Sequence, residues 1–330
     1  MTSIAVSPRK WRGTCSPEPR AVSLLKPPAV KPGARIAVVS PASPFTREEF
    51  DRGIAELRRL GYDPTYDEDV FARTGTYLSG AADVRAAAFA RAWADPSIAA
   101  LIAVRGGYGS VQMLPLLDPD MMRRTPKLFI GYSDNTSILS WLTCQCGITA
   151  LHGPMIEGRL ARGTAGFDAA SMLAFMQNGG GYTLAPDHLA VVRGGEAAGP
   201  LFGGTLTQLA ASLGTPYAFD PPAGCVLFLE DVNERPYRLD RMLTQLRLAG
   251  ILSRARALVF GEMRGCDEAS GPPCALDVVR LFAQECSGPV ITGFPSGHTA
   301  GACWTLPLGV RVRVVTAPRP SVVVEEAPVE

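Results

Sequence analysis

The sequence lacks long apolar runs, is poor in histidine and carries almost no net charge. No uninterrupted apolar stretch is long enough to span a membrane, and the N-terminal residues lack the apolar segment of a secretory signal. The 32 basic and 31 acidic side chains leave a net charge of +1, which excludes a strong field directed at nucleic acid or anionic membranes. We therefore expect a cytoplasmic protein whose partner is a small molecule.

The usual patterns of metal and nucleotide sites are also missing. The eight cysteines are dispersed over 330 residues, and Cys144 and Cys146 have no histidine or second cysteine pair at zinc spacing. The glycine-rich segment 105–109 lacks the G-x-G-x-x-G spacing of a dinucleotide-binding turn. The sequence therefore predicts neither a metal nor a cofactor.

What the sequence does contain is an alternation of apolar strands and amphipathic helices, over a length that suits two domains. Strands at 34–40 and 99–104 alternate with helices at 47–60, capped by Thr46, and at 81–94, which predicts a parallel sheet covered on both faces. In the second half the order and spacing of the expected elements change, which predicts a smaller mixed α/β domain. Its expected strands are 225–230, 257–263, 289–292 and 310–315, and its expected helices are 205–213, 237–248 and 275–285. The expected division is a flexible extension (1–22), a first α/β domain (23–178), a linker (179–195) that opens with three glycines, and a second domain (196–330).

Ser133 lies between the apolar run 127–130 and a helical stretch that starts at Asn135. A serine on a sharp strand-to-helix turn is how an α/β sheet exposes a nucleophilic hydroxyl. The same letters would arise if Ser133 or Asp134 only capped the helix, and the second glycine of the hydrolase G-x-S-x-G elbow is absent. The choice between the two interpretations depends on partners elsewhere in the chain.

Such partners are few. The glycine-rich turn 105–109 follows a strand and favours an anion-stabilising loop. Glu230 ends an apolar strand, either as a cap or as a functional carboxylate, whereas Asp231 is expected to hold the following turn. Of the three histidines, His298 sits in a glycine-flanked loop that suits a functional side chain.

The other two histidines are weaker candidates for a functional side chain. His152 either lines the same cleft or is structural, and His188 is expected to face solvent. Ser133, Glu230 and His298 would make a nucleophile, an orienting acid and a general base, because serine needs an imidazole to take its proton and the imidazole needs an acceptor for its other N–H. Spacing alone does not show that the three meet.

Several segments together resemble the LD-carboxypeptidases, a family to which the microcin C self-immunity peptidases are more distantly related. The similar segments are LKPPAVKPG (25–33), VRGGYG (104–109), IGYSD (130–134), LEDVNE (229–234) with YR (237–238) and RML (241–243), GH (297–298) and TLPLG (305–309). They occur in the expected order over about residues 23 to 320.

The resemblance implies a serine peptidase with a flavodoxin-like N-terminal domain that bears the nucleophile, a C-terminal domain that bears the acid and the histidine, and an active site at their interface. The family's triad falls on Ser133, Glu230 and His298, and its oxyanion hole on the backbone N–H groups of Gly107 and Asp134. The implied reaction is acyl transfer that releases a terminal D-alanine from a cytoplasmic murein tetrapeptide, and the implied assembly is a homodimer.

Three further residues are weaker candidates for contact with the substrate. Arg105, or another arginine near the domain interface, would pair with a substrate carboxylate. Tyr108 lies in the same glycine-rich turn, and Thr205 stands where the family more often carries asparagine, which would alter the wall of the cleft.

Two other functions remain open. One is hydrolysis of an aminoacyl-nucleotide or another acylated amino acid, which a base-stacking aromatic between Met155 and Gly181 would favour. That segment contains only Phe167 and Phe175. The other is a peptide-binding module without catalysis, against which the presence of all three triad residues argues.

Overall fold

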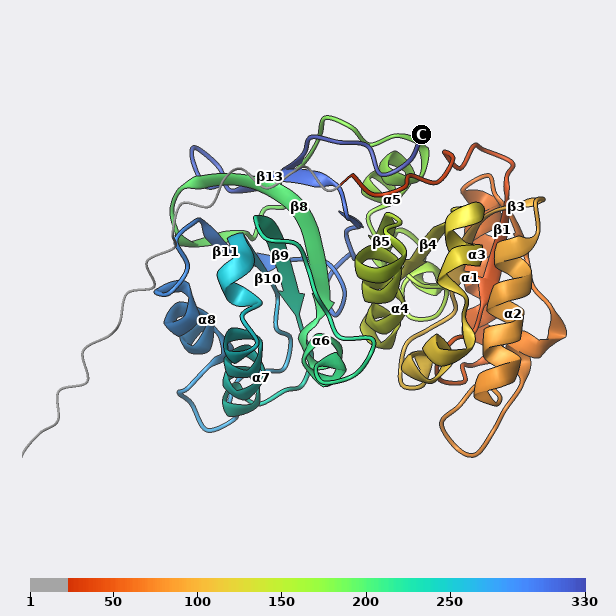
Figure 1. The fold of residues 1–330 in the computed structure, drawn as a ribbon, viewed down its shortest axis with the longest axis horizontal. Helices are drawn as coiled ribbons and strands as arrows, with labels where there is room; N and C mark the ends of the chain where they lie inside the picture. The colour runs from red at the N-terminus through yellow and green to blue at the C-terminus, as the bar shows by residue number, and fades with distance from the viewer. Residues whose placement is uncertain (1–22) are drawn as a thin grey trace, which may run out of the picture.

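The fold consists of two β-sheets that lie side by side, each with its own helices (Figure 1). It is seen in a computed structural model that describes residues 23–330, so the extension predicted for 1–22 lies outside the described residues. No helix among residues 23–330 has the length and apolar character needed to cross a bilayer. The α/β fold class predicted from the sequence is confirmed.

The first sheet has six strands in the order β12-β5-β4-β3-β1-β2. Its strands are β1 (Arg35–Val39), β2 (Asp63–Thr65), β3 (Ile98–Ala103), β4 (Leu128–Gly131), β5 (Ala150–His152) and β12 (Leu306–Leu308). The strands β1 to β5 are parallel, and their order 2-1-3-4-5 is that of flavodoxin-like sheets. In this topology ligands bind at the carboxyl ends of the strands, where the order reverses between β1 and β3.

Three of the helices on this sheet begin at a residue whose side chain caps them. The hydroxyl of Thr46 accepts a hydrogen bond from the Glu49 N–H at the start of its helix, and Asp118 and Asp168 cap two others in the same way. The helices of this half are α1 (Arg47–Arg59), α2 (Ala82–Ala94), α3 (Pro119–Arg124), α4 (Thr136–Ser140), which continues as one π-helical turn to Cys146, and α5 (Ala169–Gln177). Helix α4 contacts both β8 and α6, so it lies where the two halves meet (Figure 1).

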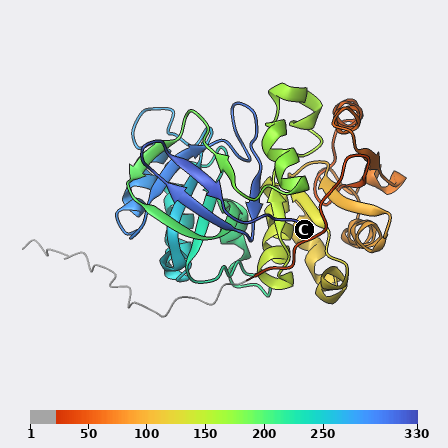
Figure 2. The same ribbon diagram turned by 90° about the horizontal axis from the view of Figure 1, so that it is seen from above.

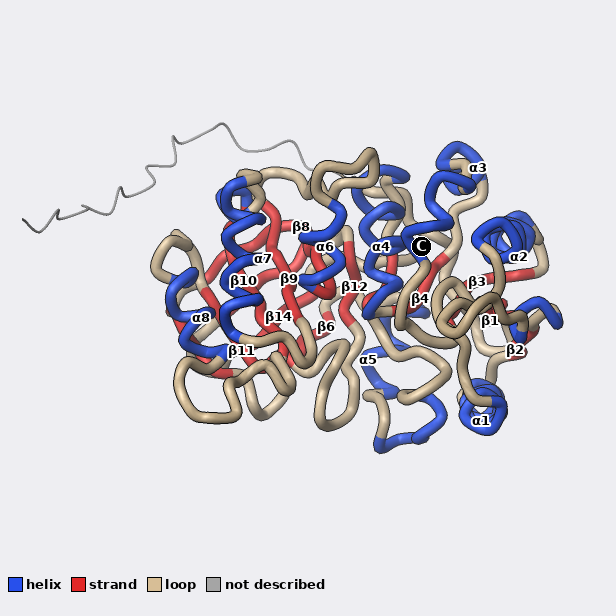
Figure 3. Tube along the Cα trace, turned by 90° about the horizontal axis from the view of Figure 1, so that it is seen from below, coloured by secondary structure: helices blue, strands red, loops and turns tan. Residues whose placement is uncertain are grey.

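The second sheet has eight strands in the order β6-β14-β13-β8-β9-β10-β11-β7. They are β6 (Tyr182–Leu184), β7 (Ala190–Arg193), β8 (Glu196–Thr205), β9 (Cys225–Glu230), β10 (Ala255–Gly261), β11 (Val290–Phe294), β13 (Arg311–Val315) and β14 (Ser321–Val324). The four central strands β8 to β11 are parallel. Its helices, α6 (Leu206–Ser212), α7 (Pro236–Leu248) and α8 (Ala275–Ala283), gather on one side of the strands (Figure 3).

Two features differ from the predicted division of the chain. The segment 179–195, predicted to be a linker, contains β6 and β7, which pair with β14 and β11 at the two edges of the second sheet. Strand β12 comes from the C-terminal part of the chain but pairs with β5, which adds it to the first sheet. The chain's end also lies against the N-terminal half (Figure 2), where Glu330 exchanges backbone hydrogen bonds with Pro27 and Ala29.

Candidate active site

Ser133 lies two residues beyond the end of β4, at the carboxyl end of the first sheet. Its φ of 62° is left-handed, a conformation that costs a residue with a side chain roughly 1–3 kcal/mol. Strain of this kind persists only where the surroundings hold it, and it is typical of a nucleophile presented on a sharp turn. The helix behind it runs through α4, whose residues Ile138 and Leu139 are fully buried.

Gly106 packs directly against this turn. A Cβ built on Gly106 would lie 2.7 Å from Ser133 Cβ, 2.9 Å from Ser133 Oγ and 3.3 Å from the backbone nitrogen of Asp134. No larger residue fits without moving the serine. The glycine-rich loop therefore brings its backbone to within contact distance of both the hydroxyl and a backbone N–H group.

Gly107, the next residue, is fixed from the other side. Its φ is 105°, and a Cβ there would lie 2.3 Å from the hydroxyl of Ser43. The same hydroxyl accepts a hydrogen bond from Tyr108 N (3.0 Å) and donates one to the Tyr77 carbonyl (2.7 Å). Three loops thus meet at Ser43 and fix the path of the glycine-rich turn.

The side chain of Asp134 braces the same loop. Asp134 is 1% exposed, and its Oδ2 accepts a hydrogen bond from Ser110 N (2.8 Å). Ser110 Oγ in turn donates to the Asp134 carbonyl (2.6 Å). Burial raises the pKa of Asp134 despite these hydrogen bonds. This arrangement explains why an acid follows the serine.

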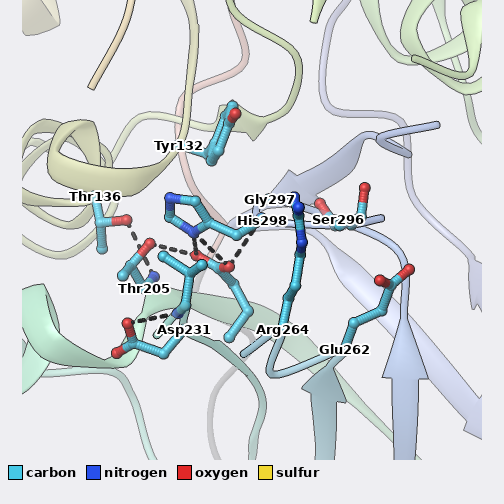
Figure 4. A network of polar contacts seen from close by, with 12 residues as sticks. Tyr132, Thr136, Thr205, Asp231, Glu262, Arg264, Ser296, Gly297 and His298 are labelled. Atoms are coloured by element: carbon cyan, nitrogen blue, oxygen red, sulfur yellow. Dashed lines mark hydrogen bonds and ion pairs between the residues drawn. The ribbon is translucent and has the colours of Figure 1, made fainter. Parts of the chain in front are cut away.

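The second sheet supplies Glu230 and His298, which lie in direct contact (Figure 4). Glu230 ends β9 and is 1% exposed, and its Oε2 lies 2.9 Å from His298 Nδ1 and accepts a hydrogen bond from His298 N (3.0 Å). Gly297 permits this approach, because a Cβ there would lie 2.6 Å from the Glu230 carboxyl carbon. With Nδ1 held by the carboxylate, the other ring nitrogen, Nε2, is left for a substrate or a nucleophile.

The two groups shift each other's pKa in opposite directions. Burial alone would raise the pKa of Glu230, but the charge of His298 and its hydrogen bond outweigh burial and lower the pKa to about 2. Burial would lower the pKa of His298, but the charge and hydrogen bonding of Glu230 raise it above its usual value. The carboxylate is therefore ionised at neutral pH and stabilises a protonated imidazole.

Thr205 connects this pair to the first sheet. Its hydroxyl donates a short hydrogen bond to Glu230 Oε1, and its backbone N–H donates to Thr136 Oγ1 (3.1 Å), three residues beyond Ser133 (Figure 4). Gly204 lies against the same threonine, since a Cβ there would be 2.7 Å from Thr136 Cγ2. Thr205, predicted to alter the cleft wall, is thus a partner of the carboxylate and is 5% exposed.

The loop that carries His298 is held by Arg159, which the sequence analysis did not identify. Arg159 is 5% exposed and donates hydrogen bonds to the carbonyls of Gly297 (2.7 Å), Thr299 (3.1 Å) and Gly301 (3.0 Å). Its Nε also lies 3.3 Å from the hydroxyl of Tyr132, whose ring packs edge-on against the His298 imidazole at 5.2 Å. No local motif marks Arg159, because its partners are backbone carbonyls distant in sequence.

The burial and hydrogen bonds of the two remaining histidines and of Asp231 indicate what each residue does. His152 is fully buried, with Nδ1 2.9 Å from Ser296 Oγ, and burial lowers its pKa to about 4. His188 is exposed, as expected. Asp231 accepts hydrogen bonds from Val232 N (2.9 Å) and from the backbone and hydroxyl of Thr207 (both 2.8 Å), so it stabilises the start of α6 as well as its own turn.

Arg105 and Tyr108 occupy different positions around the turn. The Arg105 guanidinium forms an ion pair with Glu157 (3.1 Å) and donates to the Pro44 carbonyl (3.0 Å), so it already has protein partners. Tyr108 is 45% exposed, and its ring lies 6.0 Å from that of Tyr77, which is 56% exposed. Within residues 23–330, no three histidine, cysteine or acidic side chains group as a metal site.

Profiles of known families match both halves of the chain: residues 36–153 match the LD-carboxypeptidase N-terminal domain, and residues 198–314 match the LD-carboxypeptidase C-terminal domain. The chain belongs to the LD-carboxypeptidase family. A murein tetrapeptide carboxypeptidase of Pseudomonas aeruginosa is 32% identical over 276 residues, which cover 81% of this chain and 88% of that protein.

Solved structures of this family share the fold. A muramoyltetrapeptide carboxypeptidase of Oxalobacter formigenes superposes with a TM-score of 0.75 at 29% identity, over 88% of this chain and 98% of the other. The microcin C7 self-immunity protein of Escherichia coli superposes with a TM-score of 0.83 at 22% identity, over 92% of this chain and 99% of the other. At that identity the second similarity shows the fold alone.

In this LD-carboxypeptidase, a short series of contacts connects the serine turn to the acid and the histidine. It runs from the serine turn through Thr136 and Thr205 to Glu230 and His298, and a second contact joins Tyr132 to His298. Across residues 23–330, Ser133 Oγ has no hydrogen-bond partner, and catalytic hydrogen bonds often tighten only when substrate binds. The catalytic roles of the three residues remain predictions.

Proposed function

We propose that this chain is a serine LD-carboxypeptidase that releases the terminal D-alanine of a murein tetrapeptide in the cytoplasm. The observation that carries the proposal is the pair of buried Glu230 and half-buried His298, which contacts Tyr132, the residue before the left-handed Ser133. The 32% identity to a murein tetrapeptide carboxypeptidase supports the choice of substrate.

Each step of acyl transfer has a residue suited to it. His298 Nε2 takes the proton of Ser133 Oγ as the oxygen attacks the carbonyl carbon, and Glu230 stabilises the resulting imidazolium. His298 then protonates the leaving amine of D-alanine, which leaves an acyl-enzyme on Ser133. Water, deprotonated by His298, attacks this ester, and the proton returns to Ser133 as the shortened peptide leaves.

The oxyanion formed in each half-reaction would rest on backbone N–H groups. Gly107 and Asp134 are the proposed donors, because the glycine-rich loop contacts the serine turn at Gly106 and a backbone N–H needs no reorganisation at the moment of reaction. Removing one such donor in other enzymes costs about 3 kcal/mol of transition-state stabilisation.

The rival function, hydrolysis of an acylated nucleotide, receives no support from the segment 155–181. Its two aromatic residues, Phe167 and Phe175, are 1% and 0% exposed, so neither presents a ring on which a base could stack. A binding module without catalysis has no evident use for a buried, ionised acid beside an imidazole. The homodimer that the resemblance implied stays a prediction.

The test is release of D-alanine from L-Ala-γ-D-Glu-meso-diaminopimelate-D-Ala by the full chain. Wild type, Ser133→Ala and the exposed-serine control Ser253→Ala would be compared at equal concentration, with circular dichroism to verify folding. We expect release by wild type and control and a loss of about 10⁴-fold or more in Ser133→Ala. Equal release by Ser133→Ala would remove the serine from the mechanism, and no release by folded wild type would remove the substrate.

A further inference from the structure

The segment after β10 is locked to the turn after the catalytic acid. Arg264 pairs with Val232 in a parallel bridge, and its carbonyl accepts a hydrogen bond from Asn233 N (2.9 Å). Three left-handed residues fix this geometry: Asn233 (φ 57°), Met263 (φ 49°) and Gly265 (φ 67°). Because a non-glycine residue in that region is strained, the backbone that carries Arg264 is held in place by its surroundings.

The side chain of Arg264, in contrast, has no partner in the described part of the chain. Within residues 23–330 its guanidinium forms no hydrogen bond and no ion pair, and the residue is exposed. Glu262, two residues earlier, accepts a hydrogen bond from Ala300 N (2.8 Å) and does not pair with it. Figure 4 shows Arg264 extending from the end of the strand alongside Gly297 and His298.

Other arginines of this region are already engaged. Arg105 pairs with Glu157, Arg159 donates to three carbonyls of the His298 loop, and Arg238 pairs with Glu234. Arg264 lies two residues beyond Glu262, which accepts a hydrogen bond from Ala300 in the His298 loop, and it is bridged to Val232, two residues after the catalytic acid. A guanidinium on a fixed backbone in this region, free of partners within residues 23–330, is available to a ligand. Arginine matches a carboxylate with two parallel hydrogen bonds, which gives orientation as well as affinity.

The charges around the site make such a cation useful. Glu230 is ionised, and Asp231, whose pKa burial raises to about 6, and Glu262 lie close by, so three acids of the second half of the chain surround this part of the site. The peptide substrate itself carries carboxylates, on its terminal residue and on side chains. These acids would repel a substrate carboxylate near His298, and Arg159, the cation closest to this loop in the contacts described above, already donates to three carbonyls.

We propose that Arg264 binds a carboxylate of the peptide substrate and thereby determines which peptides are cleaved. This inference rests on the proposed function. Two sources of the carboxylate fit equally: the C-terminal carboxylate of the departing residue, and the side-chain carboxylate of the diaminopimelate before it. Both lie within one residue of the bond that is cleaved.

The test measures peptide binding by calorimetry in the Ser133→Ala background, so that no peptide is consumed. Three tetrapeptides are compared: the parent, one with L-lysine in place of diaminopimelate, and one with a C-terminal carboxamide. Arg264→Gln, Arg264→Lys and the control Arg256→Gln are introduced separately. Arg256 is exposed near the start of β10, whereas Arg264 lies beyond the end of that strand, so replacing Arg256 removes the same charge far from the site.

We expect Arg264→Gln to weaken binding of the parent by roughly ten-fold or more, because hydrogen bonds to charged groups are the strong class, with partial recovery in Arg264→Lys. The analogue that lacks the recognised carboxylate will bind Ser133→Ala with the same affinity whether or not Arg264→Gln is also present. If Ser133→Ala binds all three peptides with the same affinity with and without Arg264→Gln, the inference is overturned and the proposed function is left intact. D-alanine release by wild type, measured in parallel, decides the proposed function by itself.

Discussion

His298 receives constraints from three separate residues. Glu230 holds Nδ1, Arg159 fixes the carbonyls on both sides of the loop, and Tyr132 packs against the ring. The imidazole therefore keeps one orientation before any substrate arrives. Preorganisation of this kind lowers the cost of reaching the transition state, because no side chain must be ordered during the reaction.

The raised pKa of His298 predicts the acid side of the pH–rate profile. Only the neutral imidazole accepts the serine proton, and Glu230 raises the His298 pKa above the usual value of 6.5. As pH falls through the raised pKa, the imidazole becomes protonated and loses its function as a base. We expect kcat/KM to increase with pH, with a midpoint above 6.5.

This expectation is checked by the pH dependence of D-alanine release, together with an NMR titration of the His298 ring in Ser133→Ala. The variant His188→Gln removes an exposed histidine and assists the assignment. A midpoint well below 6.5 in both measurements would contradict the raised pKa.

Among the site residues, those with a local signal were the ones open to prediction. Glu230 ends a strand, Ser133 and His298 lie in turns that follow strands, and the resemblance supplied their roles. Arg159 and the link from Thr205 to Thr136 were missed because they depend on contacts between segments far apart in the chain. The residues that neighbour them in the sequence form no pattern that predicts these contacts.

Among the loops, the glycine-rich loop packs directly against the serine turn. Replacing Gly106 by alanine would place a methyl group 2.9 Å from Ser133 Oγ and 3.3 Å from Asp134 N. The φ of Gly106 is outside the left-handed region, so the backbone itself tolerates alanine. We expect a decrease in kcat/KM of about 10²–10³-fold, because the methyl group displaces the groups that should hold the oxyanion.

Steady-state kinetics of Gly106→Ala check this prediction, with Gly194→Ala as the control at a glycine that has only one distant neighbour, Thr316 Oγ1 at 3.8 Å. Thermal melting of both variants separates loss of the site from loss of the fold. Normal turnover by Gly106→Ala would show that the loop moves aside and is not a fixed wall of the site.

The strands show the same dependence on distant contacts. β9 was predicted with its exact bounds because all six of its residues are buried and its apolar run is uninterrupted. β8 was missed because it contains Gly199, Gly203 and Gly204, which read as breakers but allow the backbone to approach its neighbours: a Cβ on Gly203 would lie 1.8 Å from the Phe228 carbonyl. β12, only Leu-Pro-Leu, gives no strand signal by itself.

At the scale of the whole molecule, the C-terminal tail is held against residues 27–29, near the start of the described part of the chain. Glu330 exchanges backbone hydrogen bonds with Pro27 (3.0 Å) and Ala29 (2.8 Å), Thr149 donates to the Pro328 carbonyl (2.6 Å), and Val329 is 4% exposed. Deleting residues 327–330 should lower the free energy of unfolding by about 3 kcal/mol, from one buried valine and the lost hydrogen bonds.

Urea unfolding of the truncated chain beside wild type measures this change. The single variant Glu330→Ala keeps every backbone hydrogen bond of the tail and is expected to unfold like wild type. An unchanged unfolding midpoint after truncation would mean that these contacts contribute nothing net to stability.

Strand β12 finally determines when the first sheet can be completed during synthesis of the chain. The edge of β5 receives its partner only after the ribosome has synthesised the chain to Leu308, when the second sheet already has all its strands except β13 and β14. Until then, the nascent first half exposes the unpaired backbone of β5, which can pair with other chains. Nascent chains that stop before Leu308 should therefore depend more on chaperones than those that extend beyond it.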